Sequence, residues 1–152
     1  MRVAYTAADG SAHIVNAAPK SQIERSLGKL TDKQYRDHVM SRSIPADATD
    51  VTELPADWVA PPRDFRNAWK LEGGKIGHDM EKCRAIHKDK LRLARAPLLA
   101  ALDVEYQRAD EADDKAAKAD IAKRKQALRD VTAAPEIEAA KTPEELKAVW
   151  PL

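Results

Sequence analysis

The stretch DMEKCRAIHKDKLRLARAPLLAALDVEYQRADEADDKAAKADIAKRKQALRD, residues 79–130, carries the only long, unbroken helical periodicity in this chain. Apolar residues recur at steps of three or four, which predicts one apolar face on a first helix. That face comprises Ile76, Met80, Cys83, His87, Leu91, Ala94, Leu98, Leu102, Tyr106 and Ala109. An acidic patch at 110–114 interrupts the stripe, which resumes at Ala117, Ile121, Leu128 and Val131. The pattern predicts two antiparallel helices joined at that patch.

The two helices differ in length. At about 1.5 Å per residue, the first is expected to extend about 45 Å and the second about 27 Å, so the first should overhang the second. We place Leu98 and Leu128 in the core of the pair, because each lies at the centre of its apolar stripe. Pro97 lies inside the first helix and lacks an amide hydrogen. Because Leu98, Leu99 and Leu102 keep one face beyond it, a kinked helix is favoured over two separate helices.

Two turns and two capping signals organise the N-terminal half. Apolar residues alternate with polar ones on both sides of Asp9-Gly10, which predicts a short β-hairpin at the start of the chain. Capping-box spacings at Ser21–Glu24 and Thr31–Gln34 predict helices from Gln22 to Gly28 and from Asp32 to about Arg42. The residues expected to face inward from these helices are Ile23, Leu27, Tyr35 and Val39.

The next segment predicts an irregular connection followed by a second hairpin. Residues 44–62 are rich in Pro, Asp, Thr and Ala, so we expect at most a short strand there, from Asp50 to Leu54. Asp64–Leu71 alternates large apolar with polar residues, and Gly73-Gly74 turns the chain back. A second β-hairpin is therefore predicted, leading into the long helix.

The C-terminal signals complete the predicted fold. Pro135 starts a helical turn, and Thr142 is the expected N-cap of a last helix from Pro143 to about Val149. We predict an α+β fold, mainly α: a long α-helical hairpin, short β-hairpins in the N-terminal half and a short C-terminal helix. Residues 1–76 form an N-terminal α/β region with hairpins and the Pro-rich connection. Residues 77–152 form the helical hairpin plus the C-terminal helix, and we expect one structural unit.

The composition of the chain limits which partners and which cellular location are expected. The chain has 152 residues, of which 34% are charged, and a formal net charge of +1. A charge so close to zero removes a general electrostatic attraction to nucleic acid or to an anionic membrane. The single cysteine, Cys83, excludes an intramolecular disulfide. The sequence has no stretch of about 18 apolar residues, and residues 1–5 lack the apolar core of a signal peptide, so we expect a soluble, unsecreted cytoplasmic protein.

No site for chemistry is predicted. His78, Cys83 and His87 offer donors for zinc, but a closed structural site needs a fourth ligand that the sequence does not supply. The Cys83–His87 pair lacks an oxyanion loop and a third orienting group for acyl transfer. The acidic residues at 110–114 match no calcium-binding loop. We therefore expect no catalytic residue, no metal and no cofactor.

The first long helix also carries a basic run. Its cations are Lys82, Arg84, Lys88, Lys90, Arg92 and Arg95. Asp79, Glu81 and Asp89 dilute them to a local surplus of +3, and no aromatic residue is interleaved for base stacking. A nucleic-acid-associated helical protein therefore stays open only as a second alternative.

Several short motifs, taken in order, resemble those of small proteins encoded near the tail genes of tailed bacteriophages and prophages, often described as tail-fibre or tail assembly chaperones. The motifs are Ile44-Pro45, Leu54-Pro55, residues 63–69 (RDFRNAW), Asp79-Met80, residues 91–103 with an Arg-x-Pro-Leu-Leu-x-x-Leu-Asp core, residues 126–130 (QALRD), residues 142–146 (TPEEL) and Trp150-Pro151. They span the last two thirds of the chain. The resemblance implies a partner protein rather than a chemical reaction.

A partner surface is expected where the first helix overhangs the second. Met80 and Ile86 lie beyond the reach of the second helix, so either other parts of this chain or another protein must cover them. Candidates for that cover inside the chain are Phe65, Trp69, Ile137, Leu146 and Trp150. We predict partner binding, by a tail or tail-fibre protein or by a second copy of the chain, at Phe65, Trp69, Met80, Ile86 and Trp150.

The leading interpretation is a non-enzymatic tailed-phage tail protein that acts through protein–protein contacts, as a tail-fibre or tail assembly factor or as a tail-associated virion subunit. The first alternative is a permanent structural virion component, such as a fibre-attachment, tip or neck subunit. The resemblance implies that the protein resides in the host cytoplasm during assembly or in the virion tail.

Overall fold

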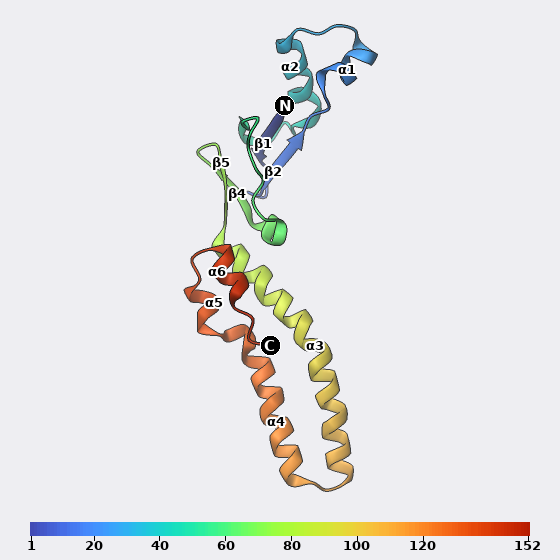
Figure 1. Cartoon of the computed structure of the whole chain (residues 1–152), viewed down its shortest axis with the longest axis vertical. Coiled ribbons are helices and arrows are strands. Elements are labelled where there is room, and N and C mark those ends of the chain that lie inside the picture. Colours follow the sequence, from blue (N-terminus) through green and yellow to red (C-terminus); the bar gives the residue numbers. More distant parts are fainter. The chain divides into compact units, whose positions relative to one another are not determined.

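The computed structural model describes residues 1–152 and is 58% helix and 15% strand, which confirms the predicted α+β, mainly α class. The chain divides into two compact units, Met1–Asp79 and Met80–Leu152. All five strands belong to the N-terminal unit, and the C-terminal unit is helical (Figure 1). None of the helices combines the length and the apolar composition that a membrane span requires.

A three-stranded antiparallel sheet forms the centre of the N-terminal unit. Its strands are β1 (Arg2–Thr6), β2 (Ala12–Asn16) and β3 (Thr49–Glu53), in the order β2-β1-β3. Val3, Ala4 and Tyr5 are all buried. Because successive residues of a strand point to opposite faces, both faces of β1 are covered. The predicted first hairpin is confirmed, and the predicted short strand at 50–54 is the third strand of this sheet.

A second, two-stranded sheet packs on the first. It is the hairpin of β4 (Trp69–Glu72) and β5 (Lys75–His78), and its turn residues Gly73 and Gly74 have φ angles of 56° and 75°. Glycine has no Cβ and adopts such positive angles readily. The two sheets share one apolar cluster, whose buried members are Ala4, Ala12, Leu54, Trp69 and Leu71.

The segment before this hairpin differs from its prediction. Residues 64–68, expected in a strand, belong to the 3-10 helix η1 (Arg63–Ala68). Phe65 and Ala68 are both buried. The segment is kinked at Phe65, with φ −121° and ψ 36°, whereas a regular strand would send Phe65 and Ala68 to opposite faces. Burial of this pair therefore favours the 3-10 helix over the predicted strand.

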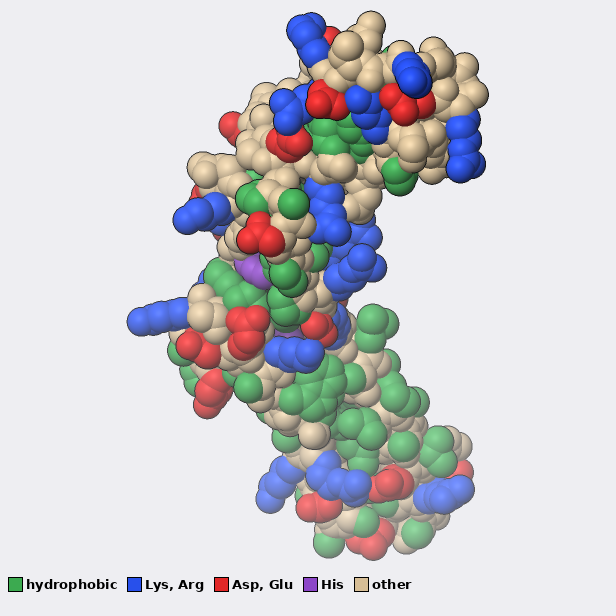
Figure 2. All heavy atoms as spheres, turned by 45° about the horizontal axis from the view of Figure 1, so that its top comes forward, with side chains coloured by type: hydrophobic (Ala, Val, Ile, Leu, Met, Phe, Trp, Pro, Cys, Tyr) green, Lys and Arg blue, Asp and Glu red, His purple; other side chains and the backbone are tan.

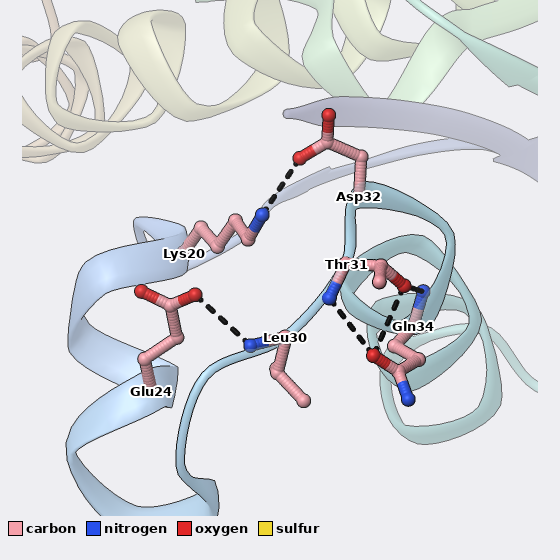
Figure 3. A network of polar contacts seen from close by, with 6 residues as sticks. All are labelled: Lys20, Glu24, Leu30, Thr31, Asp32 and Gln34. Atoms are coloured by element: carbon pink, nitrogen blue, oxygen red, sulfur yellow. Dashed lines mark hydrogen bonds and ion pairs between the residues drawn. The ribbon is translucent and has the colours of Figure 1, made fainter.

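The two short helices of the N-terminal unit are α1 (Lys20–Leu27) and α2 (Asp32–Ser43). Figure 3 shows their connection. The Thr31 hydroxyl accepts a hydrogen bond from the Gln34 amide at 3.3 Å, and the Gln34 side chain accepts one from the Thr31 amide at 2.8 Å. The capping box predicted at the start of α2 is thus confirmed.

The capping box predicted at the start of α1 is wrong. The N-cap of α1 is Pro19, and no side chain caps it. The Glu24 carboxylate instead accepts from the Leu30 amide at 3.1 Å, across the turn between the helices (Figure 3). Leu27, expected inside, is 52% exposed, whereas Tyr35 and Val39 of α2 are buried as predicted.

The C-terminal unit is built on an antiparallel pair of helices, α3 (Met80–Glu111) and α4 (Lys115–Asp130). Pro97 lies inside α3, which continues past it as one helix, as favoured from the sequence. The Asp114 carboxylate caps α4 by accepting from the Ala117 amide at 2.9 Å. At about 1.5 Å per residue, the 32 residues of α3 extend about twice as far as the 16 of α4.

Three short elements follow α4: η2 (Val131–Ala133), α5 (Pro135–Ala139) and α6 (Pro143–Ala148). Helix α6 packs on α3. The fully buried side chains of this end of the unit are Cys83, His87, Leu91, Ile137 and Leu146. The overhanging part of α3 is therefore covered from within the chain, by the C-terminal segment that the sequence offered as one candidate.

Candidate partner-binding surface

The structure places the five predicted partner-binding residues in two different units. Phe65 and Trp69 belong to the N-terminal unit and are only 2% and 5% exposed. Met80 and Ile86 are half-buried on α3, and Trp150 is 47% exposed. Within the C-terminal unit, Trp150 approaches the buried His87 ring edge-on, with 5.8 Å between ring centroids. Among the five, Trp150 offers the most free apolar surface.

A row of polar bonds holds the C-terminal segment on the first half of α3. The Arg84 guanidinium donates to the Ile137 carbonyl at 3.2 Å and to the Ala140 carbonyl at 2.8 Å. His87 Nε2 lies 2.7 Å from the Val149 carbonyl oxygen, so that nitrogen carries the proton and donates it. These bonds occupy backbone acceptors that the short elements leave unpaired.

An ion pair extends this attachment at the surface. Lys88 Nζ lies 2.6 Å from a Glu138 carboxylate oxygen, and Arg84 Nε lies 3.7 Å from the other oxygen. The hydrogen bond from Lys88 holds the pKa of the Glu138 carboxyl below its usual value, and the charge of Arg84 adds to the effect. The cations of α3 thus stabilise an internal contact.

An apolar groove opens on the other half of the unit, between α3 and α4. Its volume is about 480 Å³. It is lined by Leu98, Ala101, Leu102, Glu105, Arg124, Ala127, Leu128, Val131 and Pro151. We call it the hairpin groove. The Arg124 guanidinium and the Glu105 carboxylate, 2.9 Å apart, bridge the two helices at its wall.

Leu98, predicted as a core residue, instead lies in this groove and is 45% exposed. Ala101 and Ala127 are the neighbouring side chains from the two helices, and two methyl groups are too small to close the space beside it. Leu128 is half-buried, and Tyr106, also expected inside, is 39% exposed. The interior of the pair is formed by Leu102, Ala109 and Ile121.

Exposed apolar residues continue from the groove around α3. They are Leu93, Pro97, Leu98, Ala101 and Val104, which we call the apolar band. Leu93 is 76% exposed and Val104 50%. The spacings of three and four residues place the band on one continuous side of the helix, without a charged residue. Figure 2 shows hydrophobic side chains gathered over this hairpin.

The basic run of α3 is largely occupied within the chain. Arg84 and Lys88 bind the C-terminal segment, and Arg92 pairs with Asp89. Arg95 donates to the carbonyl groups of Leu128 and Arg129, at 3.1 and 2.5 Å. Because these cations already hold acceptors, the helix does not present the open basic face that a nucleic-acid backbone would contact.

His78, Cys83 and His87, considered as zinc ligands, have different surroundings. His78 lies in β5, and its buried Nε2 has no hydrogen-bond partner. Cys83 and His87 are buried on α3, where the His87 ring is engaged with the C-terminal segment. No group of three or more His, Cys, Asp or Glu side chains is arranged to hold a metal ion.

Comparison of the chain with protein-family models, with curated proteins and with solved structures finds no match. Periodicity alone could not find the hairpin groove, because the same spacing that put Leu98 on the core stripe also puts it at the open side of a two-helix pair. A clue was present in the alanines that face it.

Proposed function

We propose that this chain is a non-enzymatic tail protein of a tailed bacteriophage or prophage, which acts by binding another tail or tail-fibre protein, as an assembly factor or as a tail-associated virion subunit. The observation that carries the protein-binding half of the proposal is the exposed apolar band of α3 and the hairpin groove beside it. Monomeric soluble proteins rarely leave a continuous apolar surface of this kind bare. The phage context rests on the resemblance of the sequence motifs.

An amphipathic helix of the partner is the occupant that fits this surface. The groove lies between two packed helices, and an amphipathic helix binds such an apolar groove by laying its own apolar face, with anchors at helical spacing, into it. Alanines at 101 and 127 allow close approach, while Leu98 and Leu128 supply apolar contact. A third helix laid in the groove would cover the face that α4 leaves open.

Co-purification with a co-expressed phage tail-fibre protein tests the proposal. Leu98→Glu puts a charge in the groove at a residue that is already 45% exposed, so the variant should fold and lose the partner in a co-purification. Leu27→Glu, at a 52% exposed leucine of α1, is the matched control and should retain it. Retention of the partner by both variants would exclude the hairpin groove as its binding site. A parent protein that sediments as a monomer and binds none of the tail proteins offered would remove the proposal.

Mass spectrometry of purified virions separates the two roles. A transient assembly factor should be absent from the particle. A fixed copy number per virion would instead make the chain a permanent structural component, such as a fibre-attachment, tip or neck subunit. A second copy of the chain in the groove is a further outcome of the sedimentation experiment, and Leu98→Glu would then yield the monomer.

A further inference from the structure

The N-terminal unit has a groove of its own, of about 720 Å³, with a chemical character different from that of the hairpin groove. Three arginines contribute to its lining, from β1 and from η1: Arg2, Arg63 and Arg66. Trp58, Asn67 and Trp69 also line it. Cationic and amide donors thus gather beside aromatic rings in one hollow.

The arginines differ in how much of their hydrogen-bonding capacity the chain uses. Arg2 donates one bond to the Trp58 carbonyl at 2.9 Å and so is fixed at the groove. Arg63 and Arg66 are exposed and make no hydrogen bond or ion pair within the chain. The Asp9 carboxylate also lines the groove, but it accepts the Ser11 amide at 2.9 Å. The lining is left with a surplus of positive charge and unused donors.

A buried donor without a partner lines the same groove. Trp69 is 5% exposed, and its Nε1–H has no acceptor in the chain. Leaving such a group unpaired is unfavourable, so buried donors are nearly always satisfied. The lining of the groove thus includes an unpaired buried donor as well as unused guanidinium groups at its surface.

The net charge of the N-terminal unit favours one kind of anionic ligand over another. In residues 1–79, Lys and Arg are as many as Asp and Glu. A polyanion such as nucleic acid needs a basic field over an extended surface, which a unit without net charge does not provide. A carboxylate needs only a local guanidinium fork, with which it forms paired, charge-assisted bonds.

We propose that the groove formed by Arg2, Arg63, Arg66 and Trp69 binds an acidic peptide segment of a partner protein, with glutamate or aspartate carboxylates held by the two free arginines. The proposal does not depend on the phage assignment or on the hairpin groove, because it concerns a separate surface of the other unit. The half-buried Trp58 offers apolar area beside the bound carboxylates.

Fluorescence anisotropy of a fluorescein-labelled hexaglutamate peptide, titrated with the full chain at low ionic strength, tests this inference. Hexaglutamate should bind, and hexaglutamine should not. Arg63→Gln/Arg66→Gln should weaken binding by at least about tenfold, because charged hydrogen bonds to a carboxylate are lost. Arg25→Gln/Arg42→Gln removes the same charge from exposed arginines of α1 and α2 and should leave affinity within about twofold.

Nuclear magnetic resonance supplies a readout at the buried donor. The indole N–H signal of Trp69, assigned with Trp69→Phe, should move when hexaglutamate is added. Absence of hexaglutamate binding, or an equal loss in both double variants, would overturn the proposal. Tighter, arginine-dependent binding of an oligothymidylate would also overturn it and make nucleic acid the ligand. Thermal unfolding of each variant ensures that only folded proteins are compared.

Discussion

Two leucines of α3, only two positions apart, have opposite environments. Leu91 is fully buried, and Leu93 is 76% exposed. Leu91→Ala should lower the free energy of unfolding by about 2–5 kcal/mol, because it leaves a cavity that its neighbours cannot fill. Leu93→Ala should change it by less than about 0.5 kcal/mol. Urea unfolding followed by circular dichroism measures both, and similar losses would mean that α3 is rotated about its axis.

Thr142 is the N-cap residue of α6. Its hydroxyl accepts from the Glu145 amide at 3.1 Å and caps α6, as predicted from the sequence. Thr142→Ala should therefore cost about 1 kcal/mol of unfolding free energy. Thr142→Ser keeps the acceptor and should cost much less. Equal losses in the two variants, measured by urea unfolding, would assign the effect to the lost methyl group instead.

At the scale of elements, Arg95 joins α3 to the end of α4 by donating to two backbone carbonyls. Arg95→Met keeps an apolar stem but leaves the carbonyls of Leu128 and Arg129 without this donor. We expect a loss of about 1–2 kcal/mol. Arg92→Met, which breaks only the exposed pair with Asp89, should cost well under that. Chemical unfolding that ranks Arg92→Met as the more damaging change would contradict this.

The contact between α5 and α3 gives stability a dependence on pH. The pKa of Glu138 is lowered in the folded protein by the hydrogen bond from Lys88, so its ionised form stabilises the fold. That contribution is present above the ordinary value of 4.5 and is lost as pH falls through the lowered pKa. The melting temperature of Glu138→Gln should therefore be lower than that of the parent protein near neutral pH. The difference between the two melting temperatures should disappear at acidic pH. A constant difference across that range would exclude the ion pair as its cause.

Local signals predicted whole elements better than single residues. Thr31–Gln34 and Ser21–Glu24 have the same spacing, yet only the first forms a capping box, because Glu24 finds the Leu30 amide across the turn. The segment 64–68 forms helical turns kinked at Phe65 instead of a strand, and this arrangement buries both Phe65 and Ala68. In each case a competing contact, absent from the local pattern, determined the outcome.

The whole molecule has a formal net charge of only +1, and cations of α3 such as Arg84 and Lys88 are paired within the chain. The protein should not shift a labelled DNA duplex at about 150 mM salt, since few phosphates could be neutralised. An electrophoretic mobility-shift titration checks this. A shift that weakens steeply as salt is raised would restore the nucleic-acid alternative.

The sequence by itself determined most of the elements, with the segment 64–68 and the start of α1 as exceptions. The stripe of apolar residues at 79–130, the turn glycines and the threonine caps specify helices and hairpins through interactions among near neighbours, and such interactions are present in the pattern. The mainly α class, the continuous helix through Pro97 and the cap at Thr142 follow from them. The motifs also carried the expectation of a tail protein, which stays a prediction.

Only the tertiary structure decided which apolar and charged side chains remain free. Leu98 has the right spacing for a core residue, but small side chains opposite it leave a groove. The side chains of Arg84 and His87 form hydrogen bonds with backbone carbonyl groups more than 50 residues away in the sequence. Arg63 and Arg66 come together with Arg2 only when η1 packs beside the first sheet. Exposure depends on what lies across the fold, and periodicity along the chain does not contain that information.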